Sequence, residues 1–232
     1  MLDRQRYTAV LAKVAHTLVT EYGISDALFD LCDDVASLLG LRGVGVIVAD
    51  DADVLRFAAA SDDRIAVIEQ LEERYEEGPC LEAYRRGEEV VADLTDDDVF
   101  PRFSQAAVEA GLKSVQAFPM RVHGHLIGAL SLYGDDAVTL AEEEREAVRT
   151  LAAAAGAYIL NYRAYAEQAQ LAVQLQHALT SRVVIEQAKG IVAEQRELDM
   201  AAAFECIRTH ARSGGRRLHA VAQDIVDGKL TL

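Results

Sequence analysis

The sequence predicts an α+β domain with a largely antiparallel sheet and flanking helices, followed by a long coiled-coil helix and an all-α bundle of three short helices. Three observations support this fold class. Short β-rich runs occur between helical patterns over residues 1–140. A helical pattern without proline then runs from Thr139 to about Gln195. Three short amphipathic segments close the chain.

The N-terminal segment predicts two amphipathic helices. Apolar residues from Tyr7 to Tyr22 recur at spacings of three and four, and Gly23 should end this first helix. Ser25 is a plausible N-cap for the second helix, which should end at Gly40. These helices would flank a sheet that begins after them.

The sheet is predicted from β-rich runs separated by turn residues and short helices. The runs 44–49 and 54–59 surround an Asp-rich connection and should form a hairpin. A second hairpin is expected around His123-Gly124-His125. The expected strands are 44–49, 54–59, 89–92, 114–122 and 126–133, and the expected helices between them are 65–75, 80–86 and 103–110. This order is not an alternating βαβ plan, and GxGxxG and GxxxxGK[ST] motifs are absent, so a dinucleotide fold is disfavoured.

The long helix carries a heptad seam. Its residues are Leu151, Ala155, Tyr158, Tyr162, Tyr165, Ala169, Ala172, Gln176 and Leu179. A seam sustained over four heptads favours a parallel homodimer. A single helix lying across its own domain is the alternative. We expect residues 1–140 to form the α+β domain, 141–178 the dimerising coiled-coil helix and 179–232 the three-helix domain.

Charge is distributed unevenly along the 232 residues, whose net charge is -15. Residues 1–170 hold 15 Lys+Arg and 31 Asp+Glu, whereas residues 171–232 hold 8 and 7. Within 207–220 there are four Arg and no acid. The C-terminal part is therefore the part suited to a polyanion.

Cysteine usage and hydropathy indicate a cytoplasmic protein. Cys32, Cys80 and Cys206 are scattered, so their spacing supports neither a zinc site nor a disulfide framework. The N-terminus has no apolar run of signal length, and no uncharged apolar stretch reaches 18 residues. We expect no membrane association, no metal and no cofactor.

The C-terminal segments place cations along their apolar faces. Arg182, Lys189 and Arg196 are seven residues apart and should form one file on the first helix. Arg208 and Arg212 should lie on one edge of a second helix that starts after Asp199 as its N-cap. Arg216 and Arg217 follow the turn at 213–215 and open a third helix. Arginine binds phosphate bidentately and stacks on bases, although any one of these side chains is also compatible with a solvated surface.

This C-terminal part resembles an ANTAR domain, the RNA-binding module of bacterial transcription antitermination regulators. The matching residues are Ser181-Arg182, Ile185-Glu186-Gln187-Ala188-Lys189-Gly190-Ile191, Ala203-Phe204, Ile207-Arg208, Arg216-Arg217-Leu218 and Val221-Ala222. Ala211 and Gly215 depart from the polar Ser and Asn that the family commonly has.

Residues 20–160 resemble a GAF domain, which often precedes ANTAR. The marks are Glu77-Gly78-Pro79-Cys80-Leu81-Glu82-Ala83, Val91-Ala92-Asp93-Leu94 and Ile127-Gly128-Ala129-Leu130-Ser131-Leu132-Tyr133. Glu76 stands where Gly is usual, and Val99-Phe100 stands where Arg-Trp precedes the proline.

The resemblance implies a dimer that binds paired stem-loops with hexanucleotide loops in nascent transcripts and thereby prevents terminator formation. It places Arg182, Gln187, Lys189, Gly190, Arg208, Arg216 and Arg217 in or near the RNA surface, to which the charge pattern adds Arg196 and Arg212. The GAF-like domain would take a small-molecule ligand that the sequence does not identify.

Two other functions stay open. In the first, the chain is a small-molecule or redox sensor whose helical C-terminal domain binds a protein partner. In the second, it is an enzyme on a GAF-like scaffold. Cys80 follows Gly-Pro near a helix N-terminus, which suits a reactive thiol, while a buried thiol at a turn is the simpler interpretation. No Ser/His/Asp or Cys/His motif supports catalytic residues, so we expect a regulator and not an enzyme.

Overall fold

The computed structural model describes residues 2–17, 23–96, 98–137 and 139–232, without the side chains of 17, 169 and 172–182. The chain forms two compact units, Met1–Ala164 and Tyr165–Leu232. In chain order the elements are α1 (Arg4–Thr17), α2 (Ile24–Leu39), β1 (Gly43–Ala49), β2 (Leu55–Ala60), α3 (Asp63–Tyr75), α4 (Pro79–Arg86), β3 (Val90–Asp93), α5 (Pro101–Glu109), β4 (Ser114–Val122), β5 (His125–Gly134), α6 (Glu142–Arg196), α7 (Met200–Ser213) and α8 (Leu218–Val226).

The first unit is built on a five-stranded antiparallel sheet in the order β2-β1-β5-β4-β3. Both predicted hairpins, β1–β2 and β4–β5, are confirmed. The turn between β4 and β5 consists of His123 and Gly124, which have φ of 48° and 85°. Two successive positive φ values match the twist of the flanking strands, which explains why this short connection forms a tight hairpin.

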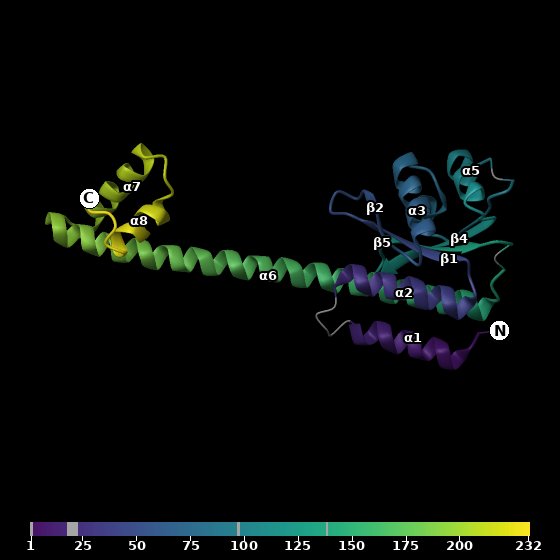
Figure 1. The fold of residues 1–232 in the computed structure, drawn as a ribbon. Coiled ribbons are helices and arrows are strands. Elements are labelled where there is room, and N and C mark those ends of the chain that lie inside the picture. The colour runs from purple at the N-terminus through teal and green to yellow at the C-terminus, as the bar shows by residue number, and fades with distance from the viewer. Residues whose placement is uncertain (1, 18–22, 97, 138) are drawn as a thin grey trace. The chain divides into compact units, whose positions relative to one another are not determined.

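Helices cover both faces of this sheet, and Figure 1 shows α3 and α5 on one face and α2 and α6 on the other. Alternation along β1 and β5 separates the two cores. Val46 and Leu130 face α2 and α6, whereas Ile47 and Ala129 pack with α4. Tyr133, at the end of β5, packs with α3 and α5. The predicted antiparallel α+β plan is therefore confirmed.

The start of α2 differs from its predicted start. The expected N-cap Ser25 is wrong, because α2 begins at Ile24 with Gly23 as its N-cap. The carbonyl of Gly23 already accepts a hydrogen bond from the Ala27 N–H at 3.0 Å, and Asp26 supplies a negative charge to the first turn. The predicted end of the first helix at Tyr22 falls on residues 18–22, which lie outside the described part of the chain.

The first third of α6 belongs to the core of the first unit. Leu151, Ala155 and Tyr158, the first three residues of the heptad seam, are at most 5% exposed. Leu151 and Ala155 belong to the core beneath the sheet, so at these positions the seam packs on its own domain and not on a second chain. Tyr162 and Tyr165 are 40% and 67% exposed. The remaining seam residues, 169, 172, 176 and 179, have side chains outside the described part.

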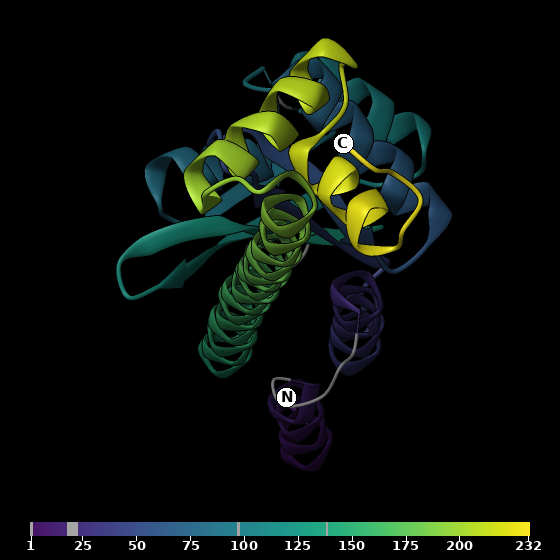
Figure 2. The ribbon, with the colours of Figure 1, turned by 90° about the vertical axis from the view of Figure 1, so that its left-hand side faces the viewer.

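The second unit contains the end of α6 together with α7 and α8, which lie beside it in both views (Figures 1 and 2). A three-helix arrangement is therefore confirmed for the C-terminal part. The division at 140/141 and 178/179 remains a prediction. In the described part of the chain, no helix has both the length and the hydrophobicity needed to cross a membrane.

Candidate functional site

The C-terminal helices form a small core of their own. Its buried residues come from all three helices: Val184, Ala188 and Val192 from α6, Ala203, Ile207 and Ala211 from α7, and Val221, Ala222 and Ile225 from α8. The spacings of three and four are those of one apolar face per helix. Ala211, one of the two departures from the ANTAR pattern, is 3% exposed and therefore packs in this core.

Turn residues set how the three helices join. Glu197 has φ of 53° and ends α6, and the Leu198 N–H donates to the Ala193 carbonyl at 3.0 Å. Asp199 caps α7 as predicted, because its side chain accepts from the Ala202 N–H at 2.8 Å. Gly215 has φ of 60°, a conformation that favours glycine, and so permits the turn into α8.

The predicted site residues of α6 differ in their surroundings. Gln187 and Gly190 are exposed, and a Cβ built on Gly190 would meet nothing within 4 Å. Lys189 is only 17% exposed, its Nζ lies 2.9 Å from a Glu186 carboxylate oxygen, and the same Nζ lies 5.8 Å from the centroid of the Phe204 ring. Lys189 therefore lies against α7.

The other end of the predicted cationic file is described only in part. Arg196 is exposed and donates from Nε to the Leu232 carbonyl at 2.6 Å. The side chain of Arg182 lies outside the described residues. A continuous file through Arg182, Lys189 and Arg196 therefore stays a prediction.

The arginines of α7 and of the following turn are accessible. Arg208 pairs with Glu205 at 2.5 Å and is 41% exposed. Arg216 pairs with Asp224 at 2.5 Å and is 42% exposed. Arg212 and Arg217 are exposed and form no ion pair with any residue that the structure describes. Such exposed pairs contribute about 0–1 kcal/mol, so phosphate groups can replace their carboxylates.

The first unit contains a cleft of about 760 Å³ between β2, α3 and α4. Arg56 lies in it and pairs with Glu73 at 2.9 Å and Asp50 at 3.3 Å. A hydrogen bond from the Phe57 N–H lowers the pKa of Glu73. Burial, followed by the hydrogen bond that Tyr84 donates to Asp53, raises the pKa of Tyr84 to about 12. The cleft therefore offers cations, carboxylates and a phenol to a polar ligand.

A buried polar cluster on the inner side of α3 was not predicted from the sequence. Glu69 and Glu72 are 0% exposed, and burial raises the pKa of Glu69 to about 7. Burial, with the nearby Glu69 charge, raises the pKa of Glu72 well above its usual range. Cys80 is fully buried next to them and forms a hydrogen bond with Ser131.

Cys80 is therefore not the low-pKa thiol that its position near a helix N-terminus suggested. Burial is the main cause that raises its pKa, and the charges of Glu69 and Glu72 add to it. The simpler interpretation of a buried thiol is confirmed. The two glutamates occupy i, i+3 positions, which appear in a sequence as part of an ordinary polar face, so only the sheet packed against them reveals their burial.

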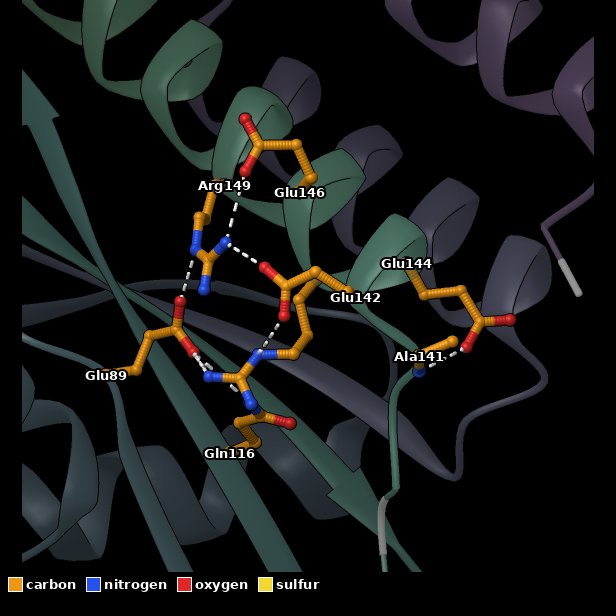
Figure 3. Close-up of polar contacts among 8 residues, drawn as sticks. Glu89, Gln116, Ala141, Glu142, Glu144, Glu146 and Arg149 are labelled. Carbon is orange, nitrogen blue, oxygen red and sulfur yellow. Dashed lines mark hydrogen bonds and ion pairs between the residues drawn. The ribbon is translucent and has the colours of Figure 1, made fainter.

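An ion-pair network joins the start of α6 to the sheet (Figure 3). Glu89, 14% exposed and just before β3, accepts from Arg145 and Arg149 at 2.5 Å each. Arg149 also contacts Glu142 at 2.8 Å and Glu146 at 3.1 Å. Because both arginines belong to α6, these ion pairs tie the start of the helix to the chain just before β3.

Comparisons with solved structures agree with the fold of the first unit. The GAF domain of a phosphoenolpyruvate-protein phosphotransferase from Coxiella burnetii is 18% identical, with a TM-score of 0.55 over 71% of this chain and 99% of that one. Free methionine-R-sulfoxide reductase from Neisseria meningitidis is 17% identical, with a TM-score of 0.52 over 68% and 91%. A GAF domain/HD domain protein from Geobacter sulfurreducens is 18% identical, with a TM-score of 0.51 over 62% and 97%. At these identities the likeness shows the fold alone.

Family models match both units. The GAF domain model matches residues 23–159 and the ANTAR domain model matches residues 173–226. No curated protein matches the chain. A GAF domain implies signal sensing, and an ANTAR domain implies RNA-binding antitermination. The chain therefore belongs to the GAF-ANTAR proteins, with a GAF domain followed by an ANTAR domain.

Proposed function

We propose that this protein is a non-enzymatic regulator that binds two adjacent hexaloop stem-loops of a nascent transcript as a homodimer, under control of a signal at its GAF domain. The ANTAR match over residues 173–226 is the observation that carries this proposal. We assign the RNA surface to Arg182, Gln187, Lys189, Gly190, Arg196, Arg208, Arg212, Arg216 and Arg217.

The exposed arginines support an RNA surface. Arg212 and Arg217 are accessible without ion pairs among the described residues, and Arg208 and Arg216 have only local partners. Sequence-specific RNA recognition uses splayed loop bases that stack on aromatic or guanidinium planes. Four arginines in an acid-free stretch provide such planes together with phosphate contacts.

Apolar side chains on α6 support the homodimer. Tyr162 and Tyr165 continue the heptad seam beyond the sensor core, and they are 40% and 67% exposed. Leu171 and Val183, further along the same helix, are 54% and 57% exposed. A second copy of α6 packed along the seam would bury Tyr162, Tyr165 and Val183, and two ANTAR modules in one particle would bind two loops with a raised effective concentration.

The cleft between β2, α3 and α4 is our candidate for the signal. Its volume of about 760 Å³ is in the range of small-molecule sites. Arg56 and Tyr84 line it, so an anionic or hydrogen-bonding ligand suits it better than an apolar one. Measurement of the protein's affinity for RNA with and without such compounds in solution would test this assignment.

The RNA-binding test uses the full chain and an RNA with two hexaloop stem-loops. We expect Lys189→Ala and Arg208→Ala each to weaken binding in a gel shift at fixed salt by at least about tenfold, which is about 1.4 kcal/mol. Lys229→Ala is the matched control, because Lys229 is a 67% exposed cation of the same unit outside the assigned surface. Unchanged affinity in both site variants, with the fold intact by circular dichroism, would refute the surface.

Sequencing the RNA that copurifies with the protein would identify its targets. We expect enrichment of paired stem-loops with wild-type protein and its loss with Lys189→Ala. If no RNA is retained at physiological salt while a protein partner is captured in an RNA-independent way, the helical domain is instead a protein-binding module. The buried, high-pKa thiol of Cys80 gives no support to the redox form of that alternative.

A further inference from the structure

Three potential metal ligands lie together inside the GAF domain. Glu69 and Glu72 project from α3 and Cys80 stands in the first turn of α4. One oxygen of each carboxylate and the Cys80 Sγ all lie within 4.8 Å of one another. Ligand atoms around one tetrahedral transition ion are about 3.3–3.8 Å apart, given metal–ligand distances of about 2.0–2.3 Å. The three side chains therefore need only a small closure to share an ion.

Each ligand side chain is held by a hydrogen bond, and each of the two glutamates keeps a second oxygen without a partner. Tyr133 donates its hydroxyl to Glu69 Oε1 at 2.9 Å, and the Leu81 N–H donates to Glu72 Oε1 at 3.0 Å. The second oxygen, Oε2, of Glu69 and of Glu72 is buried and has no hydrogen-bond partner. Ser131 contacts the Cys80 thiol. Outer contacts of this kind orient the ligands of protein metal sites.

The backbone makes room for these two carboxylates. A Cβ built on Gly45 would lie 2.1 Å from Glu69 Oε1, and one built on Gly78 would lie 2.5 Å from Glu72 Cδ. Neither glutamate forms an ion pair with a Lys, Arg or His of the described chain. Without a cation, burial favours the neutral acids, whereas a bound cation would favour the paired carboxylates. Gly45 and Gly78 leave the space beside the two side chains open.

We infer that Glu69, Glu72 and Cys80 form a buried site for one divalent transition-metal ion, of the Zn²⁺ or Fe²⁺ class. The thiol selects this class, because Mg²⁺ and Ca²⁺ prefer oxygen ligands only. Binding converts the Cys80 thiol to a thiolate and any protonated carboxyl group of Glu69 and Glu72 to a carboxylate, and all of these protons are released to solvent. Three protein ligands leave one coordination position for water or a small exogenous ligand.

This site is independent of the RNA-binding proposal, and it differs from the sequence expectation of no metal. That expectation rested on cysteine spacing, whereas this ligand set contains one cysteine and two carboxylates of a neighbouring helix. If no metal binds, the ANTAR assignment is unchanged, because the experiment measures metal binding alone.

The test titrates Co²⁺, and in parallel Zn²⁺, into the full chain after removal of metals with a chelator. We expect one ion per chain and a sulfur-to-cobalt charge-transfer band in the near ultraviolet. Cys80→Ser should abolish this band, and Glu72→Gln should lower the affinity by at least about 100-fold, since even outer-contact changes cost 10–100-fold. Mg²⁺ should not compete.

Cys32→Ser is the matched control, because Cys32 is also 0% exposed but belongs to the core on the other face of the sheet. It should keep both the band and the stoichiometry. Circular dichroism would verify that each variant is folded, and Glu69→Gln gives a second test if Cys80→Ser is not. Absence of stoichiometric binding, equal loss of the band in Cys32→Ser, or effective competition by Mg²⁺ would overturn the inference.

Discussion

Gly190→Ala should stabilise the ANTAR helices and at the same time weaken RNA binding. Gly190 lies inside α6, is exposed, and has no atom within 4 Å of the added Cβ. Alanine is about 0.8–1.0 kcal/mol more favourable than glycine in a helix interior. For a unit of this size, 1 kcal/mol raises the melting temperature by about 4–8 °C.

RNA binding should become weaker if the absence of a side chain at Gly190 permits the close approach of a partner. We expect a loss of affinity of at least about tenfold, about 1.4 kcal/mol, in a titration of the full chain against stem-loop RNA. Sedimentation would show whether RNA or a second copy of α6 approaches Gly190. Loss of the dimer in Gly190→Ala would identify the second copy of α6 as that partner. A purely structural glycine cannot give higher stability together with weaker binding.

Gly156→Ala is the control, since it makes the same change in the same helix where space is lacking. A Cβ on Gly156 would lie 2.9 Å from Val122 Cγ2 and 3.6 Å from Met120 Cβ. Overpacking costs about 1–3 kcal/mol, which offsets the gain in helix propensity. We therefore expect Gly156→Ala to be neutral or destabilising and to leave RNA affinity unchanged. A Gly190→Ala protein with raised stability and wild-type RNA affinity would refute the reasoning.

Further predictions concern single side chains. Glu76→Gly should raise the free energy of unfolding by about 0.5–1 kcal/mol in urea, because Glu76 has φ of 55°, and a residue without Cβ adopts this conformation freely. Glu89→Gln should lower it by about 1–3 kcal/mol through lost charge-assisted bonds, whereas Glu146→Gln, with a 69% exposed side chain, should change it by less than about 0.5 kcal/mol. Because the pKa of Glu73 is lowered in the folded state, its contribution to stability is present above its unfolded pKa and is lost as pH falls through the folded value. Glu73→Gln should therefore flatten the acid limb of a stability–pH curve; an unchanged limb would contradict this. Arg212→Ala should lower RNA affinity and reduce the slope of log K against log salt by about 1 if Arg212 contacts a phosphate, and an unchanged slope would exclude that contact.

The local elements followed from the sequence because short-range chemistry determines them. The turn at His123-Gly124, the Asp199 cap and the antiparallel hairpins all depend on residues next to one another. The family match followed from the same kind of signal, since the ANTAR and GAF marks are short runs with fixed spacing. These features need no knowledge of long-range packing.

Long-range packing explains what the sequence did not reveal. A heptad seam requires a packing partner but does not identify it. Leu151, Ala155 and Tyr158 are buried by the sheet or flanking helices of their own domain. Likewise, Glu69 and Glu72 have the same helical spacing as two solvated acids. Their burial comes from residues distant in sequence: Tyr133 of β5 donates to Glu69, and the Leu81 N–H of α4 donates to Glu72.

Among the cations near α7, Lys189 and Arg208 each stand beside an acid of their own helix, Glu186 and Glu205. A single phosphate that replaces one of these acids gains little, because it exchanges one exposed charge pair for another. A ligand that presents several correctly spaced phosphates and bases gains more, because its contacts add together. In a cell crowded with ribosomal and transfer RNA, this built-in competition would keep an antiterminator available for its few intended transcripts.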